Sequence, residues 1–206
     1  MNIKDILRRG PVMPVVVIDD AGHALPLARA LLAGGIRAME ITLRTPAALA
    51  AISAIAAAVP EMAVGAGTLL SAQDVHAARD AGACFGVSPG LRPAVLSAAG
   101  DWPYLPGVMT PSEVMLAIES GHDTLKFFPA GSAGGASMVR AFGGPFSSVL
   151  FCPTGGITPL SAQAYLSLPN VACVGGSWLT PREHLQSGNW TEITRLAQQA
   201  ATLRPA

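Results

Sequence analysis

The chain has very little lysine and little charge of any kind. Only Lys4 and Lys126 are lysines among its 13 basic residues, and charged residues make up 13% of the sequence. The 13 basic side chains are balanced by 13 acidic ones. A protein without a basic surplus has no extended positive surface to attract nucleic acid or an anionic membrane. We therefore expect no nucleic-acid partner and no membrane partner.

Cysteine and long hydrophobic runs are scarce as well. Cys84, Cys152 and Cys173 are odd in number, widely spaced and embedded in apolar segments, which excludes a disulfide framework and a zinc spacing. The uncharged segment 45–60 is half alanine and shorter than the roughly 18–20 strongly apolar residues of a membrane helix. Residues 1–10 lack the apolar centre of a signal peptide. These features predict a soluble cytoplasmic protein with reduced core cysteines.

What the sequence does have is a regular alternation of short apolar runs with longer, alanine-rich stretches of helical character. Strands are expected near residues 12–18, 38–41, 63–65, 84–87, 104–105, 124–127, 148–151 and 171–174. Strands spaced by roughly 20–25 residues with helices between them favour right-handed βα units and a parallel sheet.

Eight such units predict a closed (β/α)8 TIM barrel, close to the lower limit of about 200 residues for that fold. Residues 1–206 would form this single domain, and the residues before Val12 would form a short helix covering one end of the barrel. An open, doubly wound sheet is the alternative.

Helix boundaries are marked by recognisable residues. A threonine followed by proline supplies an N-cap oxygen and a residue suited to the first helical position. Such pairs occur at 45–46, 110–111, 158–159 and 180–181. Segments 110–113 and 71–74 also have the pattern of a capping box. Helix ends are expected at the glycines 34–35, 82 and 121.

Lys126 is the most informative single residue, because it lies within the apolar run Leu125–Pro129. Burial among leucine and phenylalanine favours the neutral amine, a nucleophile that arginine cannot supply. The alternative is a lysine whose stem packs on the sheet while its head reaches water at a strand end. In a barrel, functional residues follow the carboxyl ends of the strands, and Lys126 stands at the end of the sixth expected strand.

Two charged residues follow the second expected strand. Glu40 either points inward, where a buried carboxylate must be paired with Arg44 or Lys126, or it ends the strand at the surface. An inward Glu40 is a candidate acid/base group. Arg44 lies on a strand-end loop and suits a substrate carboxylate, although a surface role is the alternative. Thr68 and Pro89 follow the third and fourth strands, where they could also be a helix cap and a turn former.

Glycine-rich turns follow the seventh and eighth expected strands, at residues 153–156 and 175–178. Glycine lets the backbone approach an anion, and these two loops hold phosphate in many barrels. Neither a Walker motif nor a Rossmann fingerprint is present, since the glycines at 131–135 do not open a first βα unit. The four histidines are scattered, so no metal site and no cofactor are expected.

Together these motifs resemble the class I aldolases that act on 2-keto-3-deoxy-6-phosphogluconate (KDPG) and, in some members, on 4-hydroxy-2-oxoglutarate (KHG). The resemblance extends from about Pro11 to Pro181. Its motifs lie at residues 40–45, 64–68, 88–90, 125–130, 151–157 and 175–178. One departure is Gly131-Ser132, where an acidic and bulkier pair is expected at the rim of the loop.

The resemblance implies a homotrimer of (β/α)8 barrels and a role for each matching residue. Lys126 would form the Schiff base, and Glu40 would be the general acid/base. Arg44 and Thr68 would bind the pyruvyl carboxylate, and Thr154 would lie against the carbon chain of the substrate. Gly156, Gly176 and Ser177 would bind the phosphate. Pro89 and Gly155 would also bind the substrate. The substrate would be a keto acid phosphate, cleaved without metal or cofactor to pyruvate and glyceraldehyde 3-phosphate.

Two other functions remain open on the sequence alone. One is a phosphosugar epimerase or isomerase that uses Glu40 as a base without forming an imine. The other is a barrel that binds a phosphometabolite without catalysis.

Overall fold

A computed structural model describes residues 2–203 of the chain. The helices are α1 (Ile3–Leu7), the short 3-10 helix η1 (Ala21–His23), α2 (Ala24–Ala33), α3 (Ala48–Ala58), α4 (Ala72–Asp80), α5 (Pro93–Ala99), α6 (Pro111–Glu119), α7 (Gly135–Phe142), α8 (Pro159–Leu166), α9 (Arg182–Ser187) and α10 (Trp190–Ala201). The strands are β1 (Val12–Val16), β2 (Ala38–Thr42), β3 (Ala63–Gly67), β4 (Gly86–Val87), β5 (Tyr104–Leu105), β6 (Gly107–Val108), β7 (Thr124–Phe127), β8 (Leu150–Pro153) and β9 (Val174–Gly176).

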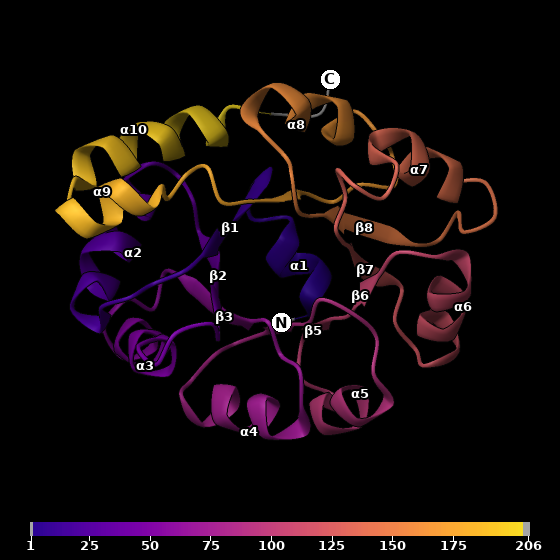
Figure 1. Ribbon diagram of the computed structural model, residues 1–206, viewed down its shortest axis with the longest axis horizontal. Coiled ribbons are helices and arrows are strands. Elements are labelled where there is room, and N and C mark those ends of the chain that lie inside the picture. The colour runs from indigo at the N-terminus through magenta and orange to yellow at the C-terminus, as the bar shows by residue number, and fades with distance from the viewer. Residues whose placement is uncertain (1, 204–206) are drawn as a thin grey trace.

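The strands lie inside a ring of helices, in which α2 to α8 follow one another in chain order (Figure 1). One sheet has the strand order β5-β4-β3-β2-β1-β9, and a second has the order β6-β7-β8. Every described strand pair is parallel. Isolated parallel bridges join Phe151 to Val171 and Thr154 to Gly175, so β8 also contacts the chain at β9. The predicted α/β fold with a parallel sheet is confirmed, and the sheet is curled.

The fifth expected strand, 104–105, is β5, which pairs with β4, and an additional strand that was not predicted, β6, pairs with β7. Pro106 lies between them and has no N–H to donate to a neighbouring strand. The described part of the chain therefore has nine strands where eight were predicted. Each of the eight predicted ranges overlaps an observed strand, with β8 and β9 displaced toward the C-terminus.

The helix starts predicted from the sequence are confirmed only where the N-cap side chain binds a backbone N–H of its own helix. Ser71, Thr110 and Thr158 are N-caps whose side chains accept a backbone N–H three residues later. The two other predicted caps, at Thr45 and Thr180, are wrong. The Thr45 hydroxyl donates instead to the carbonyl of Ile18, and α3 starts later, at Ala48. Pro181 occupies the N-cap position of α9.

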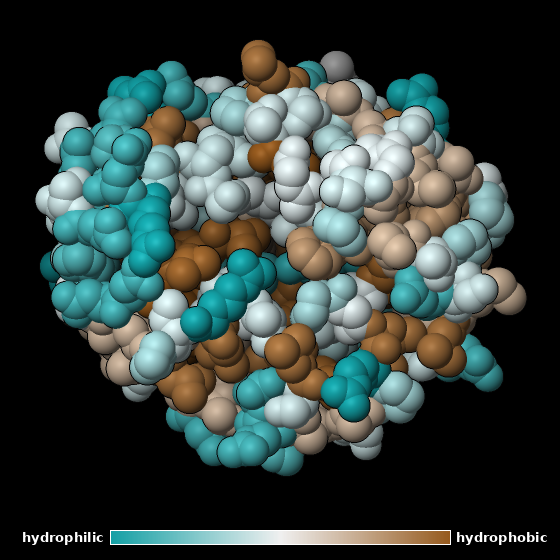
Figure 2. Space-filling model, in the orientation of Figure 1, coloured by the Kyte–Doolittle hydropathy of each residue, from teal (hydrophilic) through white to brown (hydrophobic). Residues whose placement is uncertain are grey.

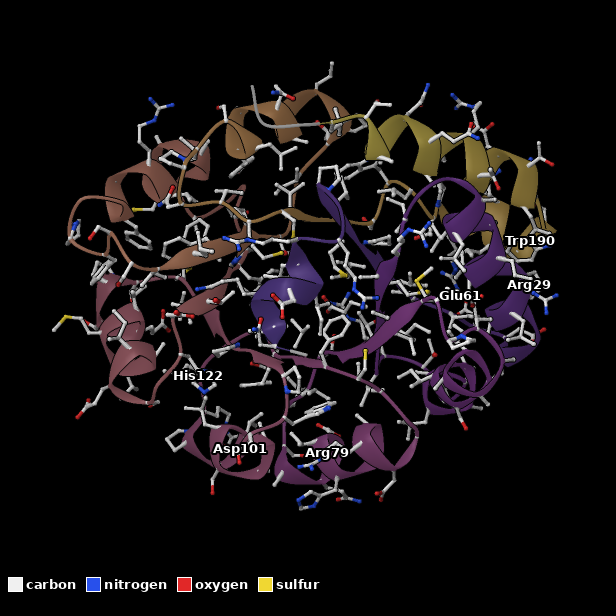
Figure 3. The ribbon with its side chains drawn as sticks, turned by 180° about the vertical axis from the view of Figure 1, so that it is seen from behind. Arg29, Glu61, Arg79, Asp101, His122 and Trp190 are labelled. Carbon is white, nitrogen blue, oxygen red and sulfur yellow. The ribbon has the colours of Figure 1, made fainter. Side chains whose placement is uncertain are left out.

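Two apolar clusters form the interior. The larger one lies between the helices and the outer faces of the strands. The smaller one combines Ile6 and Leu7 of α1 with Met13 of β1 and with Phe85, which directly precedes β4. The predicted short N-terminal helix is therefore present, and it lies across the middle of the ring (Figures 1 and 3). No helix among residues 2–203 is long and apolar enough to cross a membrane.

Candidate active site

A buried ion pair joins strands β2 and β7. The Lys126 Nζ lies 3.4 Å from the Glu40 Oε1, and the two side chains are 5% and 3% exposed. The ammonium also lies 5.3 Å from the centre of the Phe128 ring. The sequence left open a lysine head in water and a glutamate at the surface, and both alternatives are wrong. A charged pair removed from water is costly unless its members neutralise each other, as they do here.

The missing side chain of Gly67 makes room for this carboxylate. Glu40 is in register with Gly65 on β3, and Thr42 with Gly67. A Cβ on Gly67 would overlap the Glu40 carboxylate. Glycine inside a strand commonly marks such a close approach, so the run of small residues in β3 was the available sequence signal.

Arg44 does not pair with Glu40 but contacts Thr68. The Arg44 Nε donates to the Thr68 Oγ1 at 3.0 Å. Thr68 has a φ of 62°, the left-handed region, which a β-branched residue rarely adopts. The N-cap of the next helix is Ser71, so the alternative assignment of Thr68 as a helix cap is wrong. Backbone strain of this kind is concentrated at functional sites.

The two glycine-rich turns lie side by side. Gly155 and Gly156 have φ values of 99° and 71°. The backbone N–H groups of Ala130 and Gly131 donate to the carbonyls of Thr154 and Gly155, at 2.8 and 2.9 Å, which joins this turn to the loop after β7. A Cβ on Gly175 would overlap the Thr154 hydroxyl.

A cavity of about 260 Å³ opens between these groups. Seven predicted site residues line it: Arg44, Lys126, Thr154, Gly155, Gly156, Gly176 and Ser177. Glu40 and Thr68 are not lining residues, but Glu40 contacts Lys126 and Thr68 contacts Arg44, and these two partners line the cavity. In Figure 2 apolar residues gather around the middle of this face, with hydrophilic side chains among them. One amine, one guanidinium and two glycine-rich turns thus line one mouth, and the Glu40 carboxylate contacts the amine.

Pro89 is held beside this centre by its neighbours. A Cβ on Gly107, the register partner of Lys126, would overlap the Pro89 backbone. The Ser88 Oγ donates to the Gly90 carbonyl at 2.7 Å and lies 2.5 Å from the Tyr104 hydroxyl. Burial raises the pKa of Tyr104 to about 12, so its hydroxyl remains a hydrogen-bond donor at neutral pH. Nothing in the sequence around Tyr104 indicated this contact.

Two buried thiols, those of Cys152 and Cys173, lie near Lys126. Cys152 is the register partner of Lys126 on β8, and its Sγ accepts a hydrogen bond from the Cys173 Sγ at 3.5 Å. That hydrogen bond lowers the pKa of Cys152, and the charge of Lys126 acts in the same direction. The pKa of Cys173 is raised by the same contact and by burial. As predicted, both are reduced core residues.

Metal-ligating side chains are dispersed. Within residues 2–203 no group of three or more His, Cys, Asp or Glu residues could hold a metal ion. His122 packs edge-on against the Tyr104 ring and lies toward the rim of the ring of helices in Figure 3. Burial lowers its pKa, which keeps the imidazole neutral at neutral pH.

A second cavity, of about 510 Å³, adjoins the first. Val15, Val17, Arg44 and Ser177 line both. The far wall of the second cavity includes Thr180, a 6% exposed residue whose Oγ1 is the one buried side-chain oxygen or nitrogen in the described chain without a hydrogen-bond partner. A buried polar group left unpaired lowers stability.

Thr180→Val is therefore expected to stabilise the protein. The change keeps the shape of the side chain and removes the unpaired hydroxyl, which should raise the free energy of unfolding by about 1 kcal/mol. For a chain of this size the melting temperature should rise by roughly 2–4 °C. The matched control is Thr42→Val, because the buried Thr42 hydroxyl donates to the Val16 carbonyl at 2.9 Å. Thr42→Val should lower the free energy of unfolding. Calorimetry that shows a change of the same sign in both variants would contradict the prediction.

Comparison with known proteins gives a consistent result. The family described as "Aldolase: KDPG and KHG aldolase" matches residues 3–196. A 2-dehydro-3-deoxy-phosphogluconate aldolase of Pseudoalteromonas atlantica is 50% identical over 97% of this chain and 94% of its own length. A KHG/KDPG aldolase of Escherichia coli is likewise 50% identical, with the same coverage.

A solved structure has the same fold. The crystal structure of KDPG aldolase from Legionella pneumophila, with pyruvate captured as a covalent carbinolamine intermediate, has a TM-score of 0.96. It is 43% identical, and the match covers 98% of this chain and 99% of that one. The extent and identity of these matches show that the chain belongs to the KDPG and KHG aldolase family.

Proposed function

We propose that this protein is a class I aldolase that cleaves KDPG to pyruvate and glyceraldehyde 3-phosphate through a Schiff base on Lys126. The observation that carries the proposal is a buried lysine 3.4 Å from a buried carboxylate and lining an open cavity. Borohydride reduction with pyruvate tests it, since an imine at Lys126 would be converted to a stable adduct. Cleavage of 4-hydroxy-2-oxoglutarate by the same site is part of the proposal, in line with the dual name of the E. coli relative.

The reaction follows from the two charged groups. Glu40 accepts a proton from Lys126, and the neutral amine attacks the C2 carbonyl of the substrate. Glu40 then supplies the proton that lets water leave the carbinolamine, which gives a protonated imine. The C4 hydroxyl loses its proton, the C3–C4 bond breaks, and its electron pair moves into the imine to form an enamine. The aldehyde then leaves. Protonation of the enamine at C3 and hydrolysis of the resulting imine release pyruvate and free Lys126.

The other lining residues would position the substrate. Arg44, placed by Thr68, suits the pyruvyl carboxylate, because its guanidinium can pair with both oxygens. Thr154 would lie against the carbon chain of the substrate, and Pro89 would lie beside the imine. The backbone N–H groups at Gly155, Gly156 and Gly176, with the Ser177 hydroxyl, would bind the phosphate. Holding both ends of the substrate aligns the bond that breaks.

Ser177→Asp tests the phosphate site. A negative charge at this exposed position should raise the KM for KDPG by at least about tenfold, roughly 1.4 kcal/mol. Cleavage of 4-hydroxy-2-oxoglutarate, which has no phosphate, should change much less. The measurement is kcat/KM for both substrates in wild type and variant. Equal losses on both would place Ser177 in folding or at the reacting centre, and no loss on either would place the phosphate elsewhere.

The remaining features of the proposal concern architecture. We infer a single domain over residues 1–206, in which β5 and β6 together form the fifth strand and the bridges from β8 to β9 close a (β/α)8 barrel. We also propose a cytoplasmic homotrimer. It is supported by exposed apolar side chains on and near α6, namely Met109, Met115, Leu116 and Ile118, which three copies could bury against each other. A monomeric mass in sedimentation would contradict the trimer.

A further inference from the structure

The buried hydroxyl groups of Tyr104 and Ser88 have no part in the proposed reaction steps, and they support an inference that rests on the proposed aldolase function and deepens it. We propose that Tyr104 is a positioning residue for the pyruvyl half of the substrate, and that it acts through Ser88 by fixing the Pro89–Gly90 peptide beside Lys126. The aldehyde and phosphate half of the substrate is bound by other loops and does not depend on Tyr104.

The Pro89–Gly90 peptide occupies the place of a side chain next to Lys126. Gly107 and Lys126 are register partners on β6 and β7, so a Cβ on Gly107 would point to the same face of the sheet as the lysine side chain. That Cβ would overlap the Pro89 carbonyl group and would lie 2.6 Å from the Gly90 nitrogen. Because neighbouring strands are about 4.8 Å apart, the peptide lies beside the stem of the lysine.

Ser88 holds this peptide in place. Its Oγ donates to the Gly90 carbonyl at 2.7 Å, and its backbone N–H donates to the Leu105 carbonyl at 3.2 Å. A serine hydroxyl has only one proton to donate. Since that proton is directed to Gly90, the Tyr104 hydroxyl is the donor in the 2.5 Å contact between the two hydroxyls. The hydrogen bonds therefore run in one direction, from Tyr104 through Ser88 to the Gly90 carbonyl.

The Tyr104 side chain lies on the helix side of the sheet, where it has no access to the substrate. It is 2% exposed and belongs to the larger apolar cluster, between the strands and the helices. The His122 ring packs edge-on against it, with 5.8 Å between the ring centres. Burial raises the pKa of Tyr104 to about 12, so the hydroxyl keeps the proton that it donates to Ser88. Tyr104 can therefore act on the reaction only through Ser88 and the peptide.

The effect is confined to the pyruvyl half because different loops bind the two halves of the substrate. Pro89 lies on the loop after β4, and pyruvate would be attached to Lys126 beside it. The phosphate is assigned to the glycine-rich turns and Ser177, on the loops after β8 and β9. A mobile Pro89–Gly90 peptide would loosen the packing around the imine and leave the phosphate loops in place. Loss of the Tyr104 hydroxyl should therefore slow the steps that form and protonate the enamine.

The experiment follows exchange of the pyruvate methyl protons with D₂O by NMR, a half-reaction that requires the imine and the enamine but no aldehyde. Tyr104→Phe should lower kcat/KM for this exchange by about fivefold, the scale of one hydrogen bond. The KM for glyceraldehyde 3-phosphate in condensation with saturating pyruvate should change less than about twofold. The matched control is Tyr165→Phe, because Tyr165 is the only other tyrosine, is equally buried and lines neither cavity.

A double variant tests whether Tyr104 acts through Ser88. Ser88→Ala removes both hydrogen bonds and should lower the exchange by about tenfold. Tyr104→Phe combined with Ser88→Ala should lose no more than Ser88→Ala alone, because the tyrosine then has no hydroxyl to hold. Losses that multiply in the double variant would overturn the inference. If Ser88→Ala does not fold, Tyr104→Phe carries the test, since it removes a single oxygen.

The outcomes separate this inference from the proposed function. Exchange at the wild-type rate in Tyr104→Phe would overturn the role of Tyr104 alone. An equal change in the exchange and in the KM for glyceraldehyde 3-phosphate would show general support of the fold, which also overturns it. Absence of both exchange and condensation in the wild-type protein would overturn the aldolase proposal itself.

Discussion

Lys126→Met should reduce KDPG cleavage by at least about 10⁴-fold, equivalent to about 5 kcal/mol of transition-state stabilisation. Methionine has a similar length and no amine, so neither carbinolamine nor imine can form. With wild-type protein, pyruvate and borohydride should add one reduced pyruvyl group to the peptide that contains Lys126. Peptide mass spectrometry is the measurement, and the variant should show no adduct.

The chain supplies its own control, since Lys4 is the only other lysine. Lys4 forms an exposed ion pair with Asp123, and Lys4→Met should leave turnover and trapping unchanged. Lys126→Met leaves Glu40 buried without its counter-charge, which can cost roughly 3–5 kcal/mol of stability. The double variant Lys126→Met, Glu40→Gln removes that charge and keeps the test valid if the single variant unfolds. An adduct confined to Lys4, or full turnover in a folded Lys126 variant, would refute the imine.

Glu40→Gln should lower KDPG turnover by about 10²–10⁴-fold, the range for loss of a positioned acid/base group. Glutamine has the shape of glutamate and cannot exchange the proton that carbinolamine dehydration requires. Slow trapping of pyruvate on Lys126 should survive, because the amine is still present. The measurements are kcat for cleavage and the rate of adduct formation, with the exposed Glu61 changed to Gln as the matched control.

Each result for Glu40 has a distinct meaning. Wild-type turnover in Glu40→Gln would remove this carboxylate from the mechanism. If Glu40→Gln loses activity and the wild-type protein forms no adduct with pyruvate, the results would instead favour an epimerase or isomerase that uses Glu40 as a base. Binding of phosphometabolites without any turnover would favour a non-catalytic barrel.

Local patterns in the sequence predicted most of the elements, because strand length, caps and turns depend on neighbouring residues. The caps at Ser71, Thr110 and Thr158 involve residues three positions apart. The wrong prediction at Thr45 has a different origin, since its hydroxyl bonds to Ile18, 27 residues away. Competition between a local and a distant partner cannot be resolved from spacing alone.

The same reason limits what the sequence could say about the site. The unusual residues and their strand-end positions predicted a single mouth, and most of them line one cavity. Whether Glu40 pairs with Arg44 or with Lys126 depended on a contact between residues 86 positions apart. The contact between Ser88 and Tyr104, and the second cavity with Thr180 in its wall, arise from packing between distant segments and leave no motif in the sequence.

The pairing of Lys126 with Glu40 also affects how charge is handled during turnover. In the proposed reaction, a proton that moves from the ammonium to the carboxylate neutralises both groups at once. When the imine is protonated, a new cation occupies the place of the ammonium, and the carboxylate is ionised again beside it. The interior therefore carries no net charge at either stage, and the cycle avoids the large energetic penalty of an isolated ion in a dry environment.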